Sequence, residues 1–144
     1  MSESADEKPS PLRVLLAEAS ALVREGLRQM LAEVEGVRVV GEAASCAELN
    51  AVLRSTPADL LLLDLGLPCP DLFAAIASHK TARPEVRVVA LSQFASPVLE
   101  RHCLAAGADC VLSKSAGLDR LIEVVRDFAR SRSAGPSLSP PSQS

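Results

Sequence analysis

The sequence is poor in aromatic residues: its 144 residues include three phenylalanines and no tyrosine or tryptophan. Proteins that bind single-stranded nucleic acids stack the bases on aromatic rings, and this chain lacks the side chains for such a surface. Its net charge of -3 also gives no basic surface for duplex DNA. We therefore expect no nucleic-acid binding by this chain itself, and a core filled mainly by leucine, valine and alanine.

Long hydrophobic runs are missing as well. No segment approaches the roughly 18 consecutive apolar residues that indicate a membrane-spanning helix. Residues 1–10 are polar and acidic, without the basic and apolar regions of a signal peptide. We therefore expect a cytoplasmic protein that makes no contact with a membrane.

The cysteines show no metal-binding pattern. The sequence has four of them: Cys46, Cys69, Cys103 and Cys110. No two have the C-x-x-C spacing, and the nearest histidine, His102, directly adjoins Cys103. We therefore expect buried or half-buried free thiols. Cys69 lies between Pro68 and Pro70 in an expected loop, so its thiol is expected to be exposed and open to modification.

The length allows one domain with a proper core but not two ordinary ones. Residues 1–11 are polar with two prolines and are predicted to form a disordered leader. Residues 131–144 are rich in serine and proline and are predicted to form a tail or linker. The ordered domain is therefore expected to span residues 12–130.

Within this domain, five short apolar runs alternate with amphipathic stretches. The runs are residues 14–17, 37–40, 60–63, 86–91 and 110–112. Continuous runs of this length are typical of strands that are buried on both faces in a parallel sheet. The alternation predicts an α/β fold with right-handed crossovers and with helices on both faces of the sheet.

Capping residues mark the starts of the amphipathic stretches. Ser20 and Asp71 each precede an apolar stripe, and Ser45 with Glu48 has the form of a capping box. Ser96 is followed by a proline, which suits the first position of a helix, and Gly107 supplies a matching stop. A fifth helix is predicted from the apolar stripe over residues 118–128.

Polar residues follow four of the predicted strands. Glu18 follows the first strand, Asp64 ends the third, Ser92 ends the fourth and Lys114 closes the fifth. Asp64 is the most informative of them, because it ends an unbroken leucine run and precedes a loop of glycine and proline. In open parallel sheets, the crevice at the carboxyl ends of the strands is the usual binding site. We therefore expect these four side chains to meet there.

These residue types suit phosphoryl transfer. A carboxylate such as Asp64 can act as a nucleophile and carry a phosphoryl group as an acyl phosphate. Glu18, Asp64 and the carbonyl of Gly66 are candidate ligands for Mg²⁺. Lys114 and the Ser92 hydroxyl could each donate to a phosphoryl oxygen.

Three segments carry a resemblance to a known family. They are residues 13–31, residues 57–68 (PADLLLLDLGLP) and residues 107–114 (GADCVLSK). Together they resemble the receiver domain of bacterial two-component response regulators, over about residues 12–130. The first segment is similar to that of the subfamily with a C-terminal helix-turn-helix domain.

The resemblance implies a flavodoxin-like (βα)5 three-layer sandwich with strand order 2-1-3-4-5. It also implies that Asp64 accepts a phosphoryl group from a phosphohistidine on a sensor kinase. Ser92 and Lys114 would then respond to the modified site and shift the surface of the fourth and fifth helices. Receivers often pair through these helices, so a homodimer is a further expectation. Apolar candidates there are Leu99, Leu104, Leu121 and Val125, although the core needs most of them.

The sequence departs from the family pattern at three positions. The family has two adjacent acids after the first strand, and here they are Glu18 and Ala19, so one ligand for Mg²⁺ is lost. We therefore predict weak or absent Mg²⁺ binding. The aromatic residue that the family uses as a switch is replaced by Val111, and Gln93 stands where the family has a small residue.

Several functions remain open at this point. The domain could be a receiver that accepts phosphate weakly, or a receiver-like module that binds a partner protein without phosphorylation. It could also be the receiver fragment of a DNA-binding transcriptional regulator. A small phosphatase using Asp64 as nucleophile is a weaker alternative, because no second acid follows Asp64 at close spacing, so we expect no enzyme.

The remaining polar residues are interpreted as structural or solvent-facing. These are Asp59, Asp109, His79, His102, and the helix pairs Arg24 with Glu25 and Arg120 with Glu123.

Overall fold

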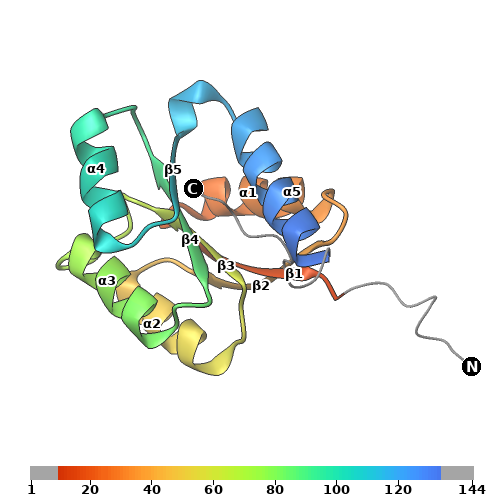
Figure 1. Ribbon diagram of the computed structural model, residues 1–144, viewed down its shortest axis with the longest axis horizontal. Coiled ribbons are helices and arrows are strands. Elements are labelled where there is room, and N and C mark those ends of the chain that lie inside the picture. Colours follow the sequence, from red (N-terminus) through yellow and green to blue (C-terminus); the bar gives the residue numbers. More distant parts are fainter. Residues whose placement is uncertain (1–9, 134–144) are drawn as a thin grey trace, which may run out of the picture.

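Five parallel strands form the centre of the molecule, in the order β2-β1-β3-β4-β5 (Figure 1). The computed structural model describes residues 10–133. Most of the predicted leader, residues 1–9, and most of the predicted tail, residues 134–144, lie outside this range. The strands are β1 (Leu12–Ala17), β2 (Val37–Ala43), β3 (Leu60–Asp64), β4 (Arg87–Ser92) and β5 (Cys110–Ser113). This order confirms the flavodoxin-like topology expected from the sequence.

Five α-helices cover the sheet, with α1 and α5 on one face and the other three on the opposite face (Figure 1). They are α1 (Ala21–Ala32), α2 (Cys46–Ser55), α3 (Leu72–Ala82), α4 (Pro97–Ala106) and α5 (Asp119–Ser133). A 3₁₀ turn, η2 (Lys114–Ala116), joins β5 to α5. No helix within residues 10–133 combines the length and the apolar character that crossing a membrane requires.

The predicted caps determine where four of these helices begin. Ser20, Ser45, Asp71 and Ser96 each adopt the N-cap position and accept a hydrogen bond from a backbone amide three residues later. Each cap thereby satisfies one of the amides that a helix leaves without an internal partner. Because all four helices follow strands of a parallel sheet, these caps lie at the carboxyl edge of the sheet, where the site residues were predicted.

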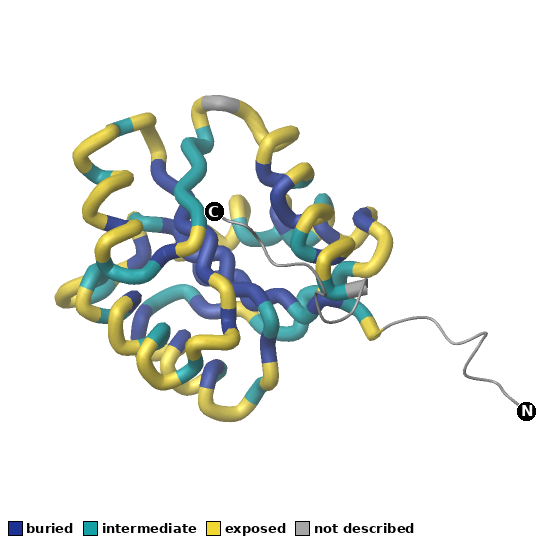
Figure 2. Tube along the Cα trace, viewed as in Figure 1, coloured by how far each residue is buried: buried dark blue, intermediate teal, exposed yellow. Residues whose placement is uncertain are grey.

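Alternate residues of the central strands enter two separate cores. Leu15, Leu61 and Val88 pack toward α2, α3 and α4, whereas Leu16 and Leu62 pack toward α1 and α5. All are at most 1% exposed, and Figure 2 shows the central strands in the dark blue of buried residues. Burial on both faces explains why β3 is a continuous leucine run. The rigid central strands fix the position of Asp64 at the end of β3.

The prediction of burial on both faces is wrong for the two edge strands. In β2, Arg38 and Glu42 are exposed, and all four residues of β5 are only partly buried. An edge strand has a neighbour on one side only, so solvent reaches more of its side chains.

Asp59 is less solvated than the sequence indicated. It precedes β3 at the far edge of the sheet, as expected, but it accepts hydrogen bonds from the backbone amide and guanidinium of Arg13 at 2.8–3.1 Å. Arg132 Nη1 also donates to this carboxylate, at 3.1 Å. Arg132 belongs to α5, which continues to Ser133 and thus extends beyond the predicted domain boundary at residue 130. Burial disfavours the charged carboxylate, but the bonds to the two arginines outweigh it and lower the pKa of Asp59.

Candidate functional site

Three of the four predicted side chains meet at the carboxyl edge of the sheet. Lys114 Nζ lies 2.6 Å from Asp64 Oδ1 and 2.9 Å from Glu18 Oε1. The three residues come from the ends of β5, β3 and β1, and Lys114 is 96 residues from Glu18 in the chain. A single ammonium group therefore contacts two carboxylates from neighbouring strands, a pairing that the sequence did not predict.

Burial distinguishes this ion pair from an ordinary surface one. The side chains of Glu18 and Asp64 are 6% and 12% exposed, and that of Lys114 is 22% exposed. Burial disfavours the charged amine, but the hydrogen bonds to Asp64 and Glu18 outweigh it and raise the pKa of Lys114 above its ordinary value of 10.5. Lys114 therefore stays a full positive charge at neutral pH.

The second oxygen of Asp64 is held by the loop that follows. Gly66 N donates to Asp64 Oδ2 at 2.9 Å, and Leu67 N donates to the backbone carbonyl of Asp64 at 3.0 Å. A Cβ at position 66 would lie 3.0 Å from Asp64 Oδ2, so glycine allows the loop this close approach. The carboxylate is thus fixed by an ammonium on one oxygen and an amide on the other.

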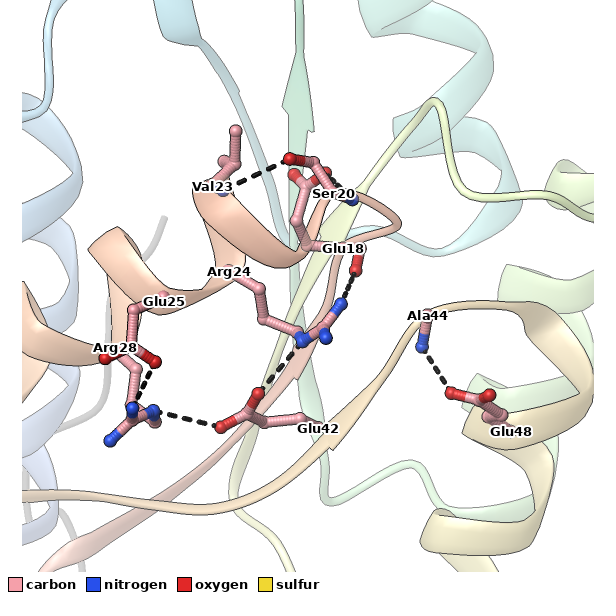
Figure 3. Close-up of polar contacts among 9 residues, drawn as sticks. All are labelled: Glu18, Ser20, Val23, Arg24, Glu25, Arg28, Glu42, Ala44 and Glu48. Carbon is pink, nitrogen blue, oxygen red and sulfur yellow. Dashed lines mark hydrogen bonds and ion pairs between the residues drawn. The ribbon is translucent and has the colours of Figure 1, made fainter.

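Glu18 is fixed by the loop into α1. Its Oε2 accepts from Ser20 N at 2.9 Å, and its backbone carbonyl accepts from Arg24 Nη1 at 2.6 Å (Figure 3). Arg24 Nε also bonds Glu42 on β2 at 2.9 Å. The interpretation of Arg24 as solvated is therefore wrong: the residue ties the β1–α1 loop to the edge strand. Its partner Glu42 is 18 residues away, so no local pattern in the sequence could have shown this.

Ser92 lies at the end of β4 but does not bond Asp64. It is 4% exposed, and its hydroxyl donates to the backbone carbonyl of Phe94 at 2.7 Å. A hollow of about 210 Å³ lies beside it, bordered by residues of β4, α4 and β5 that include Leu99 and Val111. Phe94 itself is 70% exposed. The hydroxyl is thus buried at the site edge and engaged with its own loop.

The residues present do not fit a complete magnesium site. Glu18 and Asp64 are both paired with Lys114, and Ala19 offers no side-chain ligand. Within residues 10–133, no group of three histidine, cysteine or acidic side chains gathers where it could hold a metal ion. Of the predicted ligands, the two carboxylates are both engaged by Lys114, and the third is the Gly66 carbonyl.

The cysteine prediction is wrong for one pair. Cys46 and Cys69 form a disulfide, while Cys103 is a buried free thiol and Cys110 a half-buried one. The two half-cystines are 23 residues apart in the chain, but the start of α2 packs against the loop after β3, which brings their Cα atoms within 5.2 Å. This distance is ordinary for a disulfide. Cys69 is half-buried rather than exposed.

His79 also differs from the prediction. It is half-buried on α3, and burial lowers its pKa. His102 is exposed as expected, and its ring makes a T-shaped contact with the ring of Phe73. Neither histidine is in contact with the carboxylate site.

The fold and the site together define a class: a flavodoxin-like protein with a carboxylate–lysine site at the carboxyl edge of its parallel sheet. Residues 14–126 match the family model for the response regulator receiver domain. The chain therefore belongs to the family of response regulator receiver domains, which confirms the resemblance noted in the sequence. Receiver domains as a family use Mg²⁺ in phosphorylation.

Individual relatives agree with the family match. The chain is 31% identical over 128 residues to the response regulator GacA of Pseudomonas viridiflava, covering 88% of this chain and 60% of the relative. It is 34% identical over 119 residues to the response regulator UvrY of Escherichia coli K12, covering 80% and 53%. The chain thus spans between half and two thirds of the length of these relatives.

A solved structure shows the same fold. It is a two-component response regulator of the LuxR family from Aurantimonas sp. SI85-9A1, with a TM-score of 0.78 and 25% identity. The superposition covers 85% of this chain and 87% of that one.

Proposed function

We propose that this receiver accepts a phosphoryl group slowly on Asp64, from a phosphohistidine on a sensor kinase. The observation that carries the proposal is the contact between Lys114 Nζ and Asp64 Oδ1 at 2.6 Å in a nearly buried site. Phosphoryl transfer needs positioning and neutralisation of charge more than covalent chemistry by the protein. Lys114 supplies that charge, and the Gly66 amide orients the carboxylate.

The reaction would proceed by attack of an Asp64 carboxylate oxygen on phosphorus, which forms an acyl phosphate. The bond between phosphorus and the imidazole nitrogen breaks, and its electron pair stays on the leaving imidazole, which is then protonated. Lys114 would neutralise the phosphoryl oxygens. Ser92 would donate to one of them after its hydroxyl leaves the Phe94 carbonyl.

Weak Mg²⁺ binding is part of the same proposal. When bound, Mg²⁺ would neutralise phosphoryl oxygens, with Glu18, Asp64 and the carbonyl of Gly66 as its protein ligands. Magnesium affinity follows the number and geometry of charged oxygen ligands, and Ala19 removes one of them. The slowness of the reaction follows from this loss.

Replacing Asp64 with asparagine tests the acceptor. Incubated with phosphoramidate and examined by intact mass spectrometry, the wild-type chain is expected to gain the mass of one phosphoryl group, and Asp64→Asn to gain none. Asp71→Asn is the matched control, because asparagine serves as an N-cap as well as aspartate does, and it should gain the group like the wild type. A mass gain that survives Asp64→Asn would contradict the proposal.

A second candidate is a module that binds its partner without phosphorylation. It is favoured by Lys114, which already pairs with both carboxylates, and by Val111, which has no ring to couple the site to the surface. If the wild-type chain gains no phosphoryl group from phosphoramidate or acetyl phosphate, with or without Mg²⁺, this second function replaces the first.

We further propose that the domain acts in the cytoplasm as a signalling protein rather than as an enzyme. The groups that contact the Asp64 carboxylate are an ammonium and a backbone amide. Such groups suit a carboxylate that accepts a phosphoryl group and keeps it, as a signalling protein requires. Of the apolar residues predicted for a homodimer through α4 and α5, Leu121 and Val125 are buried and Leu99 is half-buried. Such a dimer would therefore use Val98 and Leu104 on α4 and Leu118 just before α5, which are 42–55% exposed. Transcriptional output by a longer regulator is supported by the additional length of the relatives.

A further inference from the structure

A disulfide stands next to the phosphoacceptor loop. Cys46 is the first residue of α2, and Cys69 follows Asp64 by five positions. Beside the disulfide, Cys46 N donates to the Pro68 carbonyl at 3.0 Å, so the loop and the start of α2 are already in backbone contact. This backbone bond keeps the two segments in contact independently of the bond between the sulfurs.

We propose that Cys46 and Cys69 form a reversible thiol–disulfide site, which reacts with disulfide oxidants and ties the loop after Asp64 to α2. Disulfides in proteins of reducing compartments are usually transient or redox-sensing. The inference rests here on the proposed function, which assigns the domain to the cytoplasm, a compartment of this kind. The two cysteines are 23 positions apart, and the loop that they close includes all of β3 with Asp64.

The two sulfurs differ in access, which gives the reaction an order. Cys69 is half-buried between the exposed Pro68 and Pro70, whereas Cys46 is 8% exposed. An external disulfide can therefore approach Cys69 first. Of the other two cysteines, Cys103 is fully buried and Cys110 is half-buried on β5, and burial raises the pKa of both thiols. A raised pKa reduces the reactive thiolate and favours selectivity for the pair.

The chemistry is thiol–disulfide exchange in two steps. The Cys69 thiolate attacks one sulfur of a low-molecular-weight disulfide, which forms a mixed disulfide and releases one thiolate. The Cys46 thiolate then attacks the Cys69 sulfur, which forms the internal disulfide and releases the second thiolate. The protein dithiol loses two electrons and two protons, and the external disulfide is reduced to two thiols.

Oxidation would restrain the loop that orients Asp64. Gly66 N donates to Asp64 Oδ2, and Cys69 lies three positions after Gly66 in the chain. In the reduced form, the Cys46–Pro68 backbone bond would hold this loop without a covalent link. The oxidised loop should therefore open less often. This restraint would alter the rate at which a phosphoryl donor reaches the Asp64 carboxylate.

Equilibration in glutathione buffers tests the reversible disulfide. The chain is incubated over a range of reduced-to-oxidised glutathione ratios, quenched by alkylation and mapped by peptide mass spectrometry. The linked Cys46–Cys69 peptide is expected to rise as the buffer becomes oxidising and to disappear as it becomes reducing, while Cys103 and Cys110 stay alkylated. A linked peptide absent at every ratio, or present unchanged at every ratio, would overturn the proposal.

Matched single variants test the order of attack. Cys46→Ser should accumulate a glutathione adduct on Cys69, because the resolving thiol is gone, whereas Cys69→Ser should accumulate little adduct on the buried Cys46. Equal adducts on both variants would overturn the assigned order.

Hydrogen–deuterium exchange tests the effect on the loop. Peptides covering residues 65–71 are expected to exchange more slowly in the oxidised wild-type chain than in the reduced one, and Cys69→Ser should show no such difference. Equal exchange in both wild-type forms would refute the restraint. None of these readouts requires Asp64 to accept a phosphoryl group, so they are decided separately from the proposed function.

Discussion

Replacing Ala19 with aspartate is expected to raise the affinity for Mg²⁺ on the order of tenfold or more, because it adds a charged oxygen ligand to an incomplete set. In the receiver family, the residue at this position is a direct ligand of the ion. Glu18 and Asp64 are already in place at the same edge of the sheet, and the loop that carries Ala19 is fixed by Ser20 and Arg24. Isothermal titration with MgCl₂ measures the change.

Ala19→Asn is the matched control for this experiment. It adds the same side-chain shape without the charge, so its Mg²⁺ affinity should remain close to that of the wild type. If Ala19→Asp bound Mg²⁺ no better than Ala19→Asn, the missing acid would not be the cause of weak binding. If the wild-type chain bound Mg²⁺ as tightly as Ala19→Asp, the predicted deficiency itself would be wrong.

Replacing Lys114 with methionine is expected to lower the free energy of unfolding by about 3 kcal/mol, since it leaves two nearly buried carboxylates without their shared cation. The side chains of Glu18 and Asp64 are 6% and 12% exposed, so water can compensate for the loss only in part. Urea unfolding at neutral pH measures this difference. The double variant with Glu18→Gln should recover part of the loss, because only one charge is then left unpaired.

An exposed ion pair provides the control. Arg120 and Glu123 pair at 2.9 Å on α5, with side chains 58% and 64% exposed, so Arg120→Met should change the unfolding free energy only slightly. Equal effects of Arg120→Met and Lys114→Met would refute a special role for the buried pair.

The contribution of Lys114 should also depend on pH. Its pKa in the folded state is raised above 10.5, so its stabilisation is fully present below that value. It is lost as the pH rises through the raised pKa, and there the wild-type chain should approach Lys114→Met in stability. A difference between the two that persists well above that pKa would contradict the assigned ion pair.

The fold could be predicted from the sequence because its signals are local. The leucine run of β3 and the caps Ser20, Ser45, Asp71 and Ser96 each act within a few residues, and all of them are confirmed. Strand order followed from the family resemblance rather than from any local pattern. The convergence of Glu18, Asp64 and Lys114 could be predicted because parallel strands bring their carboxyl ends to one edge.

Most of the incorrect predictions concern contacts between residues that are not neighbours in the chain. The Cys46–Cys69 disulfide depends on how the start of α2 packs against the loop after β3, which no spacing in the sequence specifies. The bonds that Arg24 donates to Glu42 and Arg132 donates to Asp59 likewise span 18 and 73 residues of the chain. A sequence shows the type of each polar residue but not its partner, so polar residues on helices and turns are interpreted as solvated even where the fold gives them a partner.

The Mg²⁺ dependence of phosphoryl incorporation tests most directly whether Lys114, rather than a metal ion, neutralises the phosphoacceptor Asp64. The wild-type chain is incubated with phosphoramidate, first with a chelator and then with increasing MgCl₂, and the fraction carrying one phosphoryl group is followed by intact mass. We expect slow incorporation that is already present with the chelator and changes little across the titration, because Ala19 leaves the ion too weakly bound to replace Lys114 in this role. No incorporation with the chelator, followed by a steep rise with MgCl₂, would contradict the account.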